Sequence, residues 1–99
     1  VMTVQSSGRR TFFHNRGANA LWSPKHVSIA KIKAKIFHLG YLLLLDQFDQ
    51  PDKTHATVAA AFLARLRKAG IRTSIDCVSE ESDRFSTFVR PALKHTDYC

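Results

Sequence analysis

Residues 11–19 combine a strand-like pattern with a polar, glycine-containing turn. This stretch begins with a strand-like pattern and breaks at Arg16-Gly17, where glycine lets the backbone turn. His14 and Asn19 supply an imidazole and a carboxamide, which can donate and accept hydrogen bonds. Each has a plainer interpretation. His14 can be an exposed strand histidine, and Asn19 can stabilise its own turn.

The elements that would position this turn start at the beginning of the chain. Residues 1–5 form a second strand-like run, and residues 6–9 contain a glycine and have the length that closes a β-hairpin. We therefore expect residues 1–16 to form a hairpin that ends in a polar turn. Beyond it, residues 18–22 favour a short helical turn. Ser23 is placed to cap a further short helix through about residue 30, with Pro24 in its first position.

A second candidate site lies where two predicted strands end. Residues 36–39 form an apolar run typical of a buried parallel strand, which we expect to stop at Gly40-Tyr41. Residues 71–76 read as a strand that ends in Asp76, and a helix separates the two. Strand, helix and strand predict a right-handed parallel βαβ unit. Because ligands collect beyond the carboxyl ends of such strands, Gly40, Tyr41 and Asp76 should share one edge.

The helix between these strands is the clearest element. We expect it over residues 53–69, capped by Asp52 or Thr54, with an apolar stripe at four- and three-residue spacing. Basic residues in its last turn suit the helix dipole, and Gly70 supplies a left-handed stop. In the polar loop before it, Asp46 and Asp49 are expected to cap the loop rather than to bind a metal.

The C-terminal part predicts one more helix and one more strand. Ser82 or Asp83 can cap a helix over residues 84–93, in which Pro91 would kink or end the helix. Its inward side chains are expected to be Phe85, Phe88, Val89 and Leu93. Residues 97–99 look like the first residues of a third strand.

Length and charge limit the function classes. A chain of 99 residues with 44% hydrophobic and 23% charged residues suits one modest globular core. The net charge of +7 is uneven, because residues 1–45 contain no acid and seven basic residues: Arg9, Arg10, Arg16, Lys25, Lys31, Lys33 and Lys35. An acid-free basic half suggests a nucleic-acid-binding module as an alternative function, although its basic residues are spread over several elements. The asymmetry is equally expected if acids elsewhere in a longer protein balance it.

The cysteines and histidines offer a third alternative. Cys77 and Cys99 form no Cys-x-x-Cys pair, so we expect reduced thiols and, without a visible leader, a cytoplasmic protein. The longest apolar run, residues 41–45, is too short to cross a membrane. A metal site would have to use the remaining donors, whose separations match no zinc spacing: His14, His26, His38, His55 and His95 with the two cysteines.

The order and spacing of four stretches resemble the PfkB or ribokinase-like family of carbohydrate and nucleoside kinases. The four stretches are residues 11–20, residues 38–44, residues 66–76, and residues 89–93 together with 97–99. In the first stretch, Gly17-Ala18-Asn19 matches the family's Gly-Ala-Asn turn. The resemblance covers essentially the whole chain. It implies a ribokinase-like three-layer α/β/α fold with parallel βαβ units, in which residues 1–16 form a β-lid hairpin and residues 17–99 part of the core domain.

This resemblance implies a substrate-binding role within a kinase that uses ATP and Mg²⁺. The implied substrate-binding residues are Met2, Phe12, His14, Asn19, Gly40 and Tyr41. Because side chains alternate along a strand, Phe12 and His14 are expected to face the sugar and Phe13 to face away. The family's glycine pair, Asn-x-x-Glu motif and catalytic Gly-Ala-Gly-Asp segment are not among these residues. We therefore expect a middle piece that is inactive alone, and a homodimer formed through the lid is possible. Phe12 and Met2 can instead pack only against neighbouring elements or a partner's lid.

Overall fold

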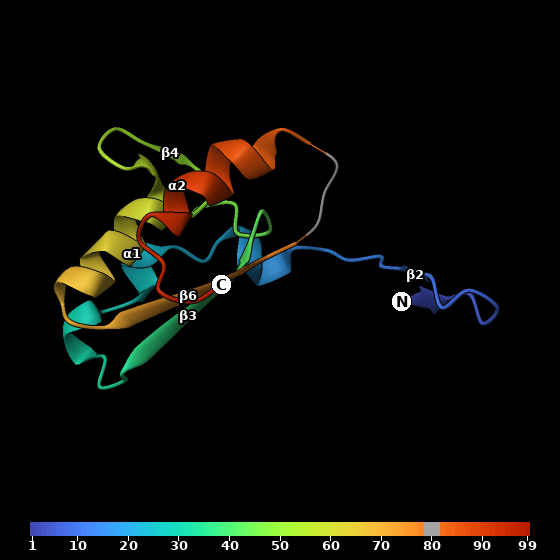
Figure 1. Ribbon diagram of the computed structural model, residues 1–99, viewed down its shortest axis with the longest axis horizontal. Coiled ribbons are helices and arrows are strands. Elements are labelled where there is room, and N and C mark those ends of the chain that lie inside the picture. Colours follow the sequence, from blue (N-terminus) through green and yellow to red (C-terminus); the bar gives the residue numbers. More distant parts are fainter. Residues whose placement is uncertain (79–81) are drawn as a thin grey trace.

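The chain is a mixed α/β protein in which two helices cover one face of a small parallel sheet (Figure 1). The computed structural model describes residues 1–78 and 82–99. Strands β3 (Ile36–Leu42) and β6 (Arg72–Cys77) pair in parallel, and α1 (Val58–Lys68) and α2 (Arg90–Leu93) lie above them. The expected parallel pairing of these strands is confirmed. The described residues form two layers, one of helices and one of strands. They do not show the third layer that the family resemblance implies.

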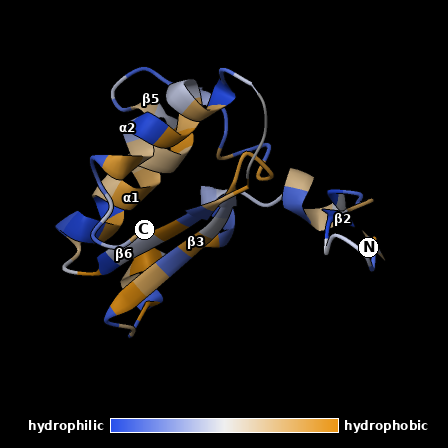
Figure 2. Cartoon of the chain, turned by 45° about the vertical axis from the view of Figure 1, so that its right-hand side comes forward, coloured by the Kyte–Doolittle hydropathy of each residue, from blue (hydrophilic) through white to orange (hydrophobic). Residues whose placement is uncertain are grey.

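Strand β3 is longer and less buried than its sequence predicts. It continues through Gly40-Tyr41 to Leu42, which pairs with Cys77 after an irregularity in the ladder, so the expected stop at Gly40 is wrong. Burial alternates, with Leu39 fully buried and Ile36 44% exposed. Only one face therefore packs against α1, where Phe37 meets Phe62 edge to face at 5.5 Å. Figure 2 shows apolar residues alternating with more polar ones along β3, and mainly apolar residues along α1.

Helix α1 begins five residues later than predicted, at Val58 instead of residue 53. The intervening residues form a small antiparallel pair, β4 (Pro51–Asp52) with β5 (Ala56–Thr57). The cap is Thr57, whose hydroxyl accepts from the Ala60 amide at 3.1 Å, so Asp52 and Thr54 were the wrong candidates. Asp52 instead accepts the amides of Thr54 and His55 within the turn. The helix is followed, as expected, by a left-handed Gly70 with φ of +79°.

The core joins α1 to the loop that follows β3. Phe48 is fully buried between Trp22 and Phe62, with ring centroids 4.7 Å and 5.4 Å away. Leu63 and Leu66 of α1 complete this side of the core. No helix in residues 1–78 and 82–99 is long and apolar enough to cross a membrane.

In the C-terminal helix, the structure buries a different face from the one that the sequence predicts. Residues Phe85–Val89 form a π-helix (η4) that leads into α2, and Pro91 lies within α2 rather than ending it. Val89 and Ala92 are buried, but Phe85 is 44% and Leu93 40% exposed, so the expected inward positions of these two were wrong. A π-turn holds more residues than an α-turn, and this shifts which side chains face the core.

The expected third strand is present as a single bridge. Tyr98 pairs in parallel with Ser74 on β6, and its amide donates to the Thr73 carbonyl at 3.0 Å. The Asp97 carboxylate accepts from the amide of Thr73 at 2.8 Å and lies 3.4 Å from Arg67. The hydrogen bond from the Thr73 amide lowers the pKa of Asp97 below its usual value, and Arg67 adds to this.

The N-terminal hairpin is short and projects from the body (Figure 1). It pairs β1 (Met2–Thr3) with β2 (Arg10–Thr11), fewer residues than the predicted strands contain, and Gly8 has a φ of +66° in the turn. Three short 3-10 turns follow, η1 (Gly17–Ala20), η2 (Pro24–His26) and η3 (Ile29–Lys31). Ser23 and Pro24 begin η2 as expected, but the single helix predicted through residue 30 is replaced by η2 and η3.

The position of the α1 cap can be tested directly. Thr57→Ala should lower the free energy of unfolding by about 1 kcal/mol, because the Ala60 amide loses its acceptor. Thr57→Ser, which keeps the hydroxyl, should lose less. Thr54→Ala is the matched control, since Thr54 is exposed and does not cap the helix. Urea denaturation followed by circular dichroism measures all three, and equal losses at positions 54 and 57 would contradict the assignment.

Candidate functional site

The carboxyl ends of β3 and β6 bring together residues from distant parts of the chain. A Cβ atom placed on Gly40 would lie 3.6 Å from the Asp76 Cβ and 2.8 Å from His38 Nε2. Glycine therefore leaves room for the His38 ring, and Gly40 itself is exposed. Tyr41, the next residue, is 52% exposed. The structure thus confirms the expected neighbourhood of Gly40 and Asp76, with Tyr41 beside them.

The outer face of the sheet is polar and was missed by the sequence analysis. His38 Nδ1 lies 3.1 Å from Ser74 Oγ across the two strands. Arg72 donates to the Tyr98 hydroxyl at 2.6 Å, and its guanidinium lies over the Tyr98 ring. Interpreting residues 36–39 as a buried strand hid this face. The alternation of polar residues at positions 72, 74 and 76 was the signal that could have revealed it.

The turn that follows the hairpin is tied to the loop that follows β3. Arg16 forms an ion pair with Asp46, and Gln47 Nε2 donates to the Ala20 carbonyl at 3.4 Å. Within the turn, Asn15 Oδ1 accepts from the Gly17 amide at 2.9 Å. The side chain that stabilises this turn is therefore Asn15, whereas Asn19 was the residue considered for that role.

Asn19 lies on the surface. It is exposed and borders a shallow hollow together with Trp22 and His26. His26 Nδ1 is 3.1 Å from the Ser23 amide, which donates to it. The hollow is open and combines a carboxamide, an indole and an imidazole. It offers stacking and hydrogen bonding to a ligand, without a group placed for covalent chemistry.

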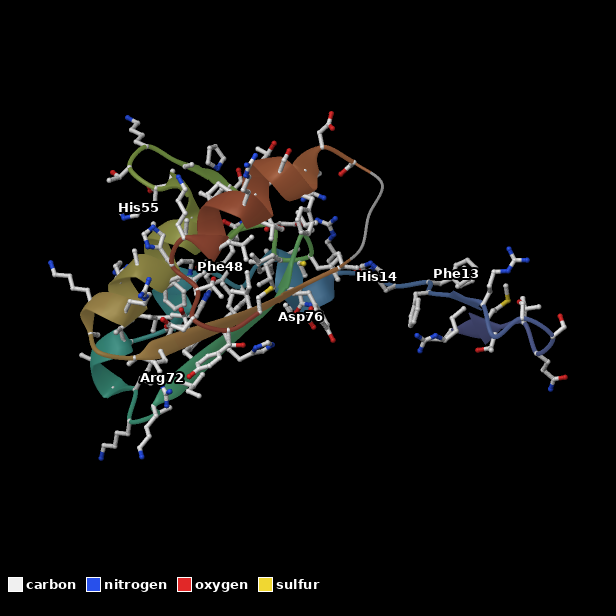
Figure 3. All side chains as sticks on the ribbon, in the orientation of Figure 1. Phe13, His14, Phe48, His55, Arg72 and Asp76 are labelled. Carbon is white, nitrogen blue, oxygen red and sulfur yellow. The ribbon has the colours of Figure 1, made fainter. Side chains whose placement is uncertain are left out.

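The expected ligand-facing residues of the hairpin are on its projecting part. Met2 is 62% and Phe12 60% exposed, and Phe13 and His14 lie on the segment that leads from the hairpin to the body (Figure 3). In the observed register Met2 is opposite Thr11, and residues that face each other across an antiparallel pair point to the same side. The pairing therefore groups Met2 with Thr11 rather than with Phe12.

Asp49 organises the loop that carries Asp46. Its carboxylate is buried and accepts the amides of Leu43 at 3.1 Å and Leu45 at 3.2 Å, which confirms the expected loop cap. Burial raises the pKa of Asp49, while these hydrogen bonds and Arg84, 3.7 Å away, partly oppose the increase. Asp49 is therefore a structural group, and Asp46 pairs with Arg16.

The described residues offer little for metal or thiol chemistry. Residues 1–78 and 82–99 contain no cluster of three or more His, Cys, Asp or Glu side chains that could hold a metal ion. Cys77 and Cys99 are free. Burial raises the pKa of the Cys77 thiol, and the neighbouring Cys99 and Asp76 add to the increase, so Cys77 is a poor nucleophile at neutral pH.

Comparisons of the chain with protein-family models, curated proteins and solved structures gave no match. The candidate site is therefore defined by geometry alone. It consists of the sheet edge at Gly40, Tyr41 and Asp76, together with the turn at residues 16–19 and the projecting hairpin. These parts expose polar groups at the surface, and the His38–Ser74 hydrogen bond lies beside Gly40 and Asp76.

The link between the turn and the strand-end loop can be measured. Arg16 and Asp46 are about one-third exposed, at 35% and 36%, so the pair is partly screened by solvent. A double-mutant cycle with Arg16→Gln and Asp46→Asn should give a coupling energy of roughly 0.2–1 kcal/mol in urea denaturation, smaller at high salt. Strictly additive losses, unchanged by salt, would show that the two side chains do not interact.

Proposed function

We propose that this chain is part of an ATP-dependent kinase of the PfkB or ribokinase-like family, which phosphorylates a hydroxyl of a sugar or nucleoside. In this proposal the chain supplies lid and substrate-pocket residues. Phosphoryl transfer would use segments outside these 99 residues, because the family's catalytic Gly-Ala-Gly-Asp segment is not among them. Binding and positioning are the work assigned to this chain, and in phosphoryl transfer they account for much of catalysis.

One observation carries the proposal. A projecting hairpin leads into a turn that is ion-paired with the loop following β3, the first strand of a parallel strand–helix–strand unit. The carboxyl edge of such a unit is where open α/β sheets bind their ligands, and Gly40 is exposed there beside His38 and Asp76. A hairpin beside such an edge can act as a lid that excludes water from the substrate.

The proposed roles follow from side-chain chemistry. Phe12 and Met2 would cover the apolar face of a sugar ring, and His14 would hydrogen-bond a hydroxyl from the lid. Asn19 would contact the substrate from the turn, and the backbone at Gly40-Tyr41 would contact it from the sheet. For these groups to meet, the lid has to close toward Gly40, since in the structure Met2 and Phe12 are exposed on the projecting hairpin.

The same proposal includes a second helical layer and a homodimer. A second helical layer on the outer face of the sheet would complete a three-layer fold and cover Ile36 and Tyr98, which are 44% and 46% exposed. A homodimer through the hairpin would bury its exposed apolar residues: Val1, Met2, Val4, Phe12 and Phe13. Both arrangements cover apolar area that water now contacts.

ATP and Mg²⁺ are cofactors of the proposed complete enzyme and are not assigned to residues of this chain. At the sheet edge Asp76 is the carboxylate beside Gly40, and its Oδ1 already accepts the Cys77 amide at 2.7 Å. Mg²⁺ is usually held by one or two carboxylates together with substrate phosphates and water. The described residues therefore do not fit an ATP–Mg²⁺ site by themselves, and no reaction step is assigned to them.

The proposal is tested by comparing two proteins. The longer protein that carries the Gly-Ala-Gly-Asp segment should hydrolyse or transfer the ATP γ-phosphoryl group only when a sugar or nucleoside is present. The 99-residue chain should show no turnover. A coupled ADP assay over a panel of sugars and nucleosides measures both.

A longer protein that binds sugars without consuming ATP would overturn the kinase proposal. The alternative of a nucleic-acid-binding module predicts a different result, namely salt-dependent retention of the chain on DNA together with indifference to sugars. The ion pair of Arg16 with Asp46 reduces the free positive charge available to that alternative.

The lid and turn residues should affect substrate binding more than the chemical step. His14→Ala or Asn19→Ala in the complete enzyme should raise KM for the sugar more than it lowers kcat, because these side chains would select the substrate without taking part in the transfer. Phe13→Leu, expected to face away from the substrate, is the control and should leave both values near those of the parent enzyme. A fall in kcat with KM unchanged would place the chemistry in this stretch instead.

A further inference from the structure

A basic hollow lies on the helical side of the molecule, away from the sheet edge. It has a volume of about 490 Å³ and lies between the β4–β5 turn and the C-terminal helices. Its polar lining comes from Thr54, His55, Ser86, Arg90, Lys94 and His95. Four of these six carry nitrogen groups that are cationic or become so on protonation, and the described lining contains no acid.

The two imidazoles of the hollow are held by separate anchors. Their rings meet edge to face with centroids 5.3 Å apart. The His55 amide donates to Asp52 Oδ1 at 2.8 Å, and the His95 carbonyl accepts from the buried Thr73 hydroxyl at 2.6 Å. The β4–β5 turn thus fixes the backbone of one histidine, and strand β6 fixes the backbone of the other. A ligand beside the two rings would meet an arrangement that is largely formed in advance.

Positive groups crowd this hollow. Burial lowers the pKa of His95, and the like charges of His55, Arg67 and Lys94 lower it further. Arg67 is partly neutralised by Asp97, 3.4 Å away. Within residues 1–78 and 82–99, neither Arg90 nor Lys94 takes part in an ion pair. Their charges therefore remain available to a ligand.

The Asp52 carboxylate beside His55 offsets part of this charge. Asp52 lies 3.7 Å from His55 Nδ1, but its Oδ1 already accepts two backbone amides, those of Thr54 and His55. These hydrogen bonds lower the pKa of Asp52, so the carboxylate stays ionised near His55, and the charge that attracts an anion comes from Arg90 and Lys94. A bound anion would thus meet the imidazole rings and the Arg90 and Lys94 side chains.

We propose that this hollow binds the phosphate group of a small phosphorylated molecule or of free phosphate. A guanidinium offers paired donors that match phosphate oxygens, an ammonium adds a point charge, and two imidazoles add further donors. The site is independent of the kinase proposal. In Figure 3 His55 and Asp76 lie in different parts of the molecule, so a ligand here would act as an effector or a second ligand rather than as the substrate of the sheet edge.

Histidine NMR gives a site-specific test. Inorganic phosphate is added at constant pH and ionic strength while the Cε1–H resonances of the five histidines are followed. His55 and His95 should shift in a saturable way, and His14, His26 and His38 should not. A parallel titration with glycerol phosphate distinguishes the sources, because tighter binding than inorganic phosphate indicates a phosphate ester and equal or weaker binding indicates free phosphate.

Matched variants separate this site from general attraction to a basic protein. Arg90→Gln with Lys94→Gln should weaken phosphate binding about tenfold or more, since two charge-assisted contacts are lost. The control, Arg65→Gln with Lys68→Gln, removes the same residue types from another surface hollow and should retain binding. Equal loss in both variants, a uniform shift of all five histidines, or the absence of any shift would overturn the proposal.

Discussion

The packing of Phe48 is the interaction on which the rest of this small structure depends. Its ring is fully buried between Trp22 and Phe62, so one side chain joins the N-terminal turns, the loop after β3 and helix α1. Burying a phenylalanine contributes about 1.5–3 kcal/mol, a large share of the stability of a domain this size. The loop reaches this position because Asp49 accepts the amides of Leu43 and Leu45. The same loop carries Asp46, and the turn after the hairpin is therefore positioned by the core.

The elements that the sequence predicts well are those specified by local signals. The parallel pairing of β3 with β6 follows from two apolar strands separated by a helix, and the end of α1 follows from Gly70. The first residue of α1 could not be predicted from local signals, because Thr54 and Thr57 both suit a helix cap. Tertiary contacts decide: the Val58 amide donates to the Gln50 carbonyl, and the Ala59 amide donates to the Phe48 carbonyl. These partners become visible only when the loop is folded.

The candidate site likewise contains parts that sequence patterns predict and parts that only tertiary contacts determine. The proximity of Gly40 and Asp76 follows from a general rule about parallel sheets, and the structure bears it out, although both residues lie within their strands and not beyond the strand ends. The ion pair of Arg16 with Asp46 joins residues 30 positions apart and has no local pattern. The basic hollow is likewise assembled from a turn and a helix that no motif connects. The kinase proposal adds a lid movement that brings the hairpin toward the edge.

The parallel pairing of β3 with β6 also has a kinetic consequence. Partners such as His38 and Ser74 are 36 residues apart, so the ladder forms only after a long loop closes. Helix α1 lies within that loop and is built from contacts three or four residues apart, which form fastest. The order this favours is helix first, docking of Phe62 on Phe48 next, and strand pairing last. The sheet edge proposed to bind substrate would then be among the final parts of the molecule to take shape.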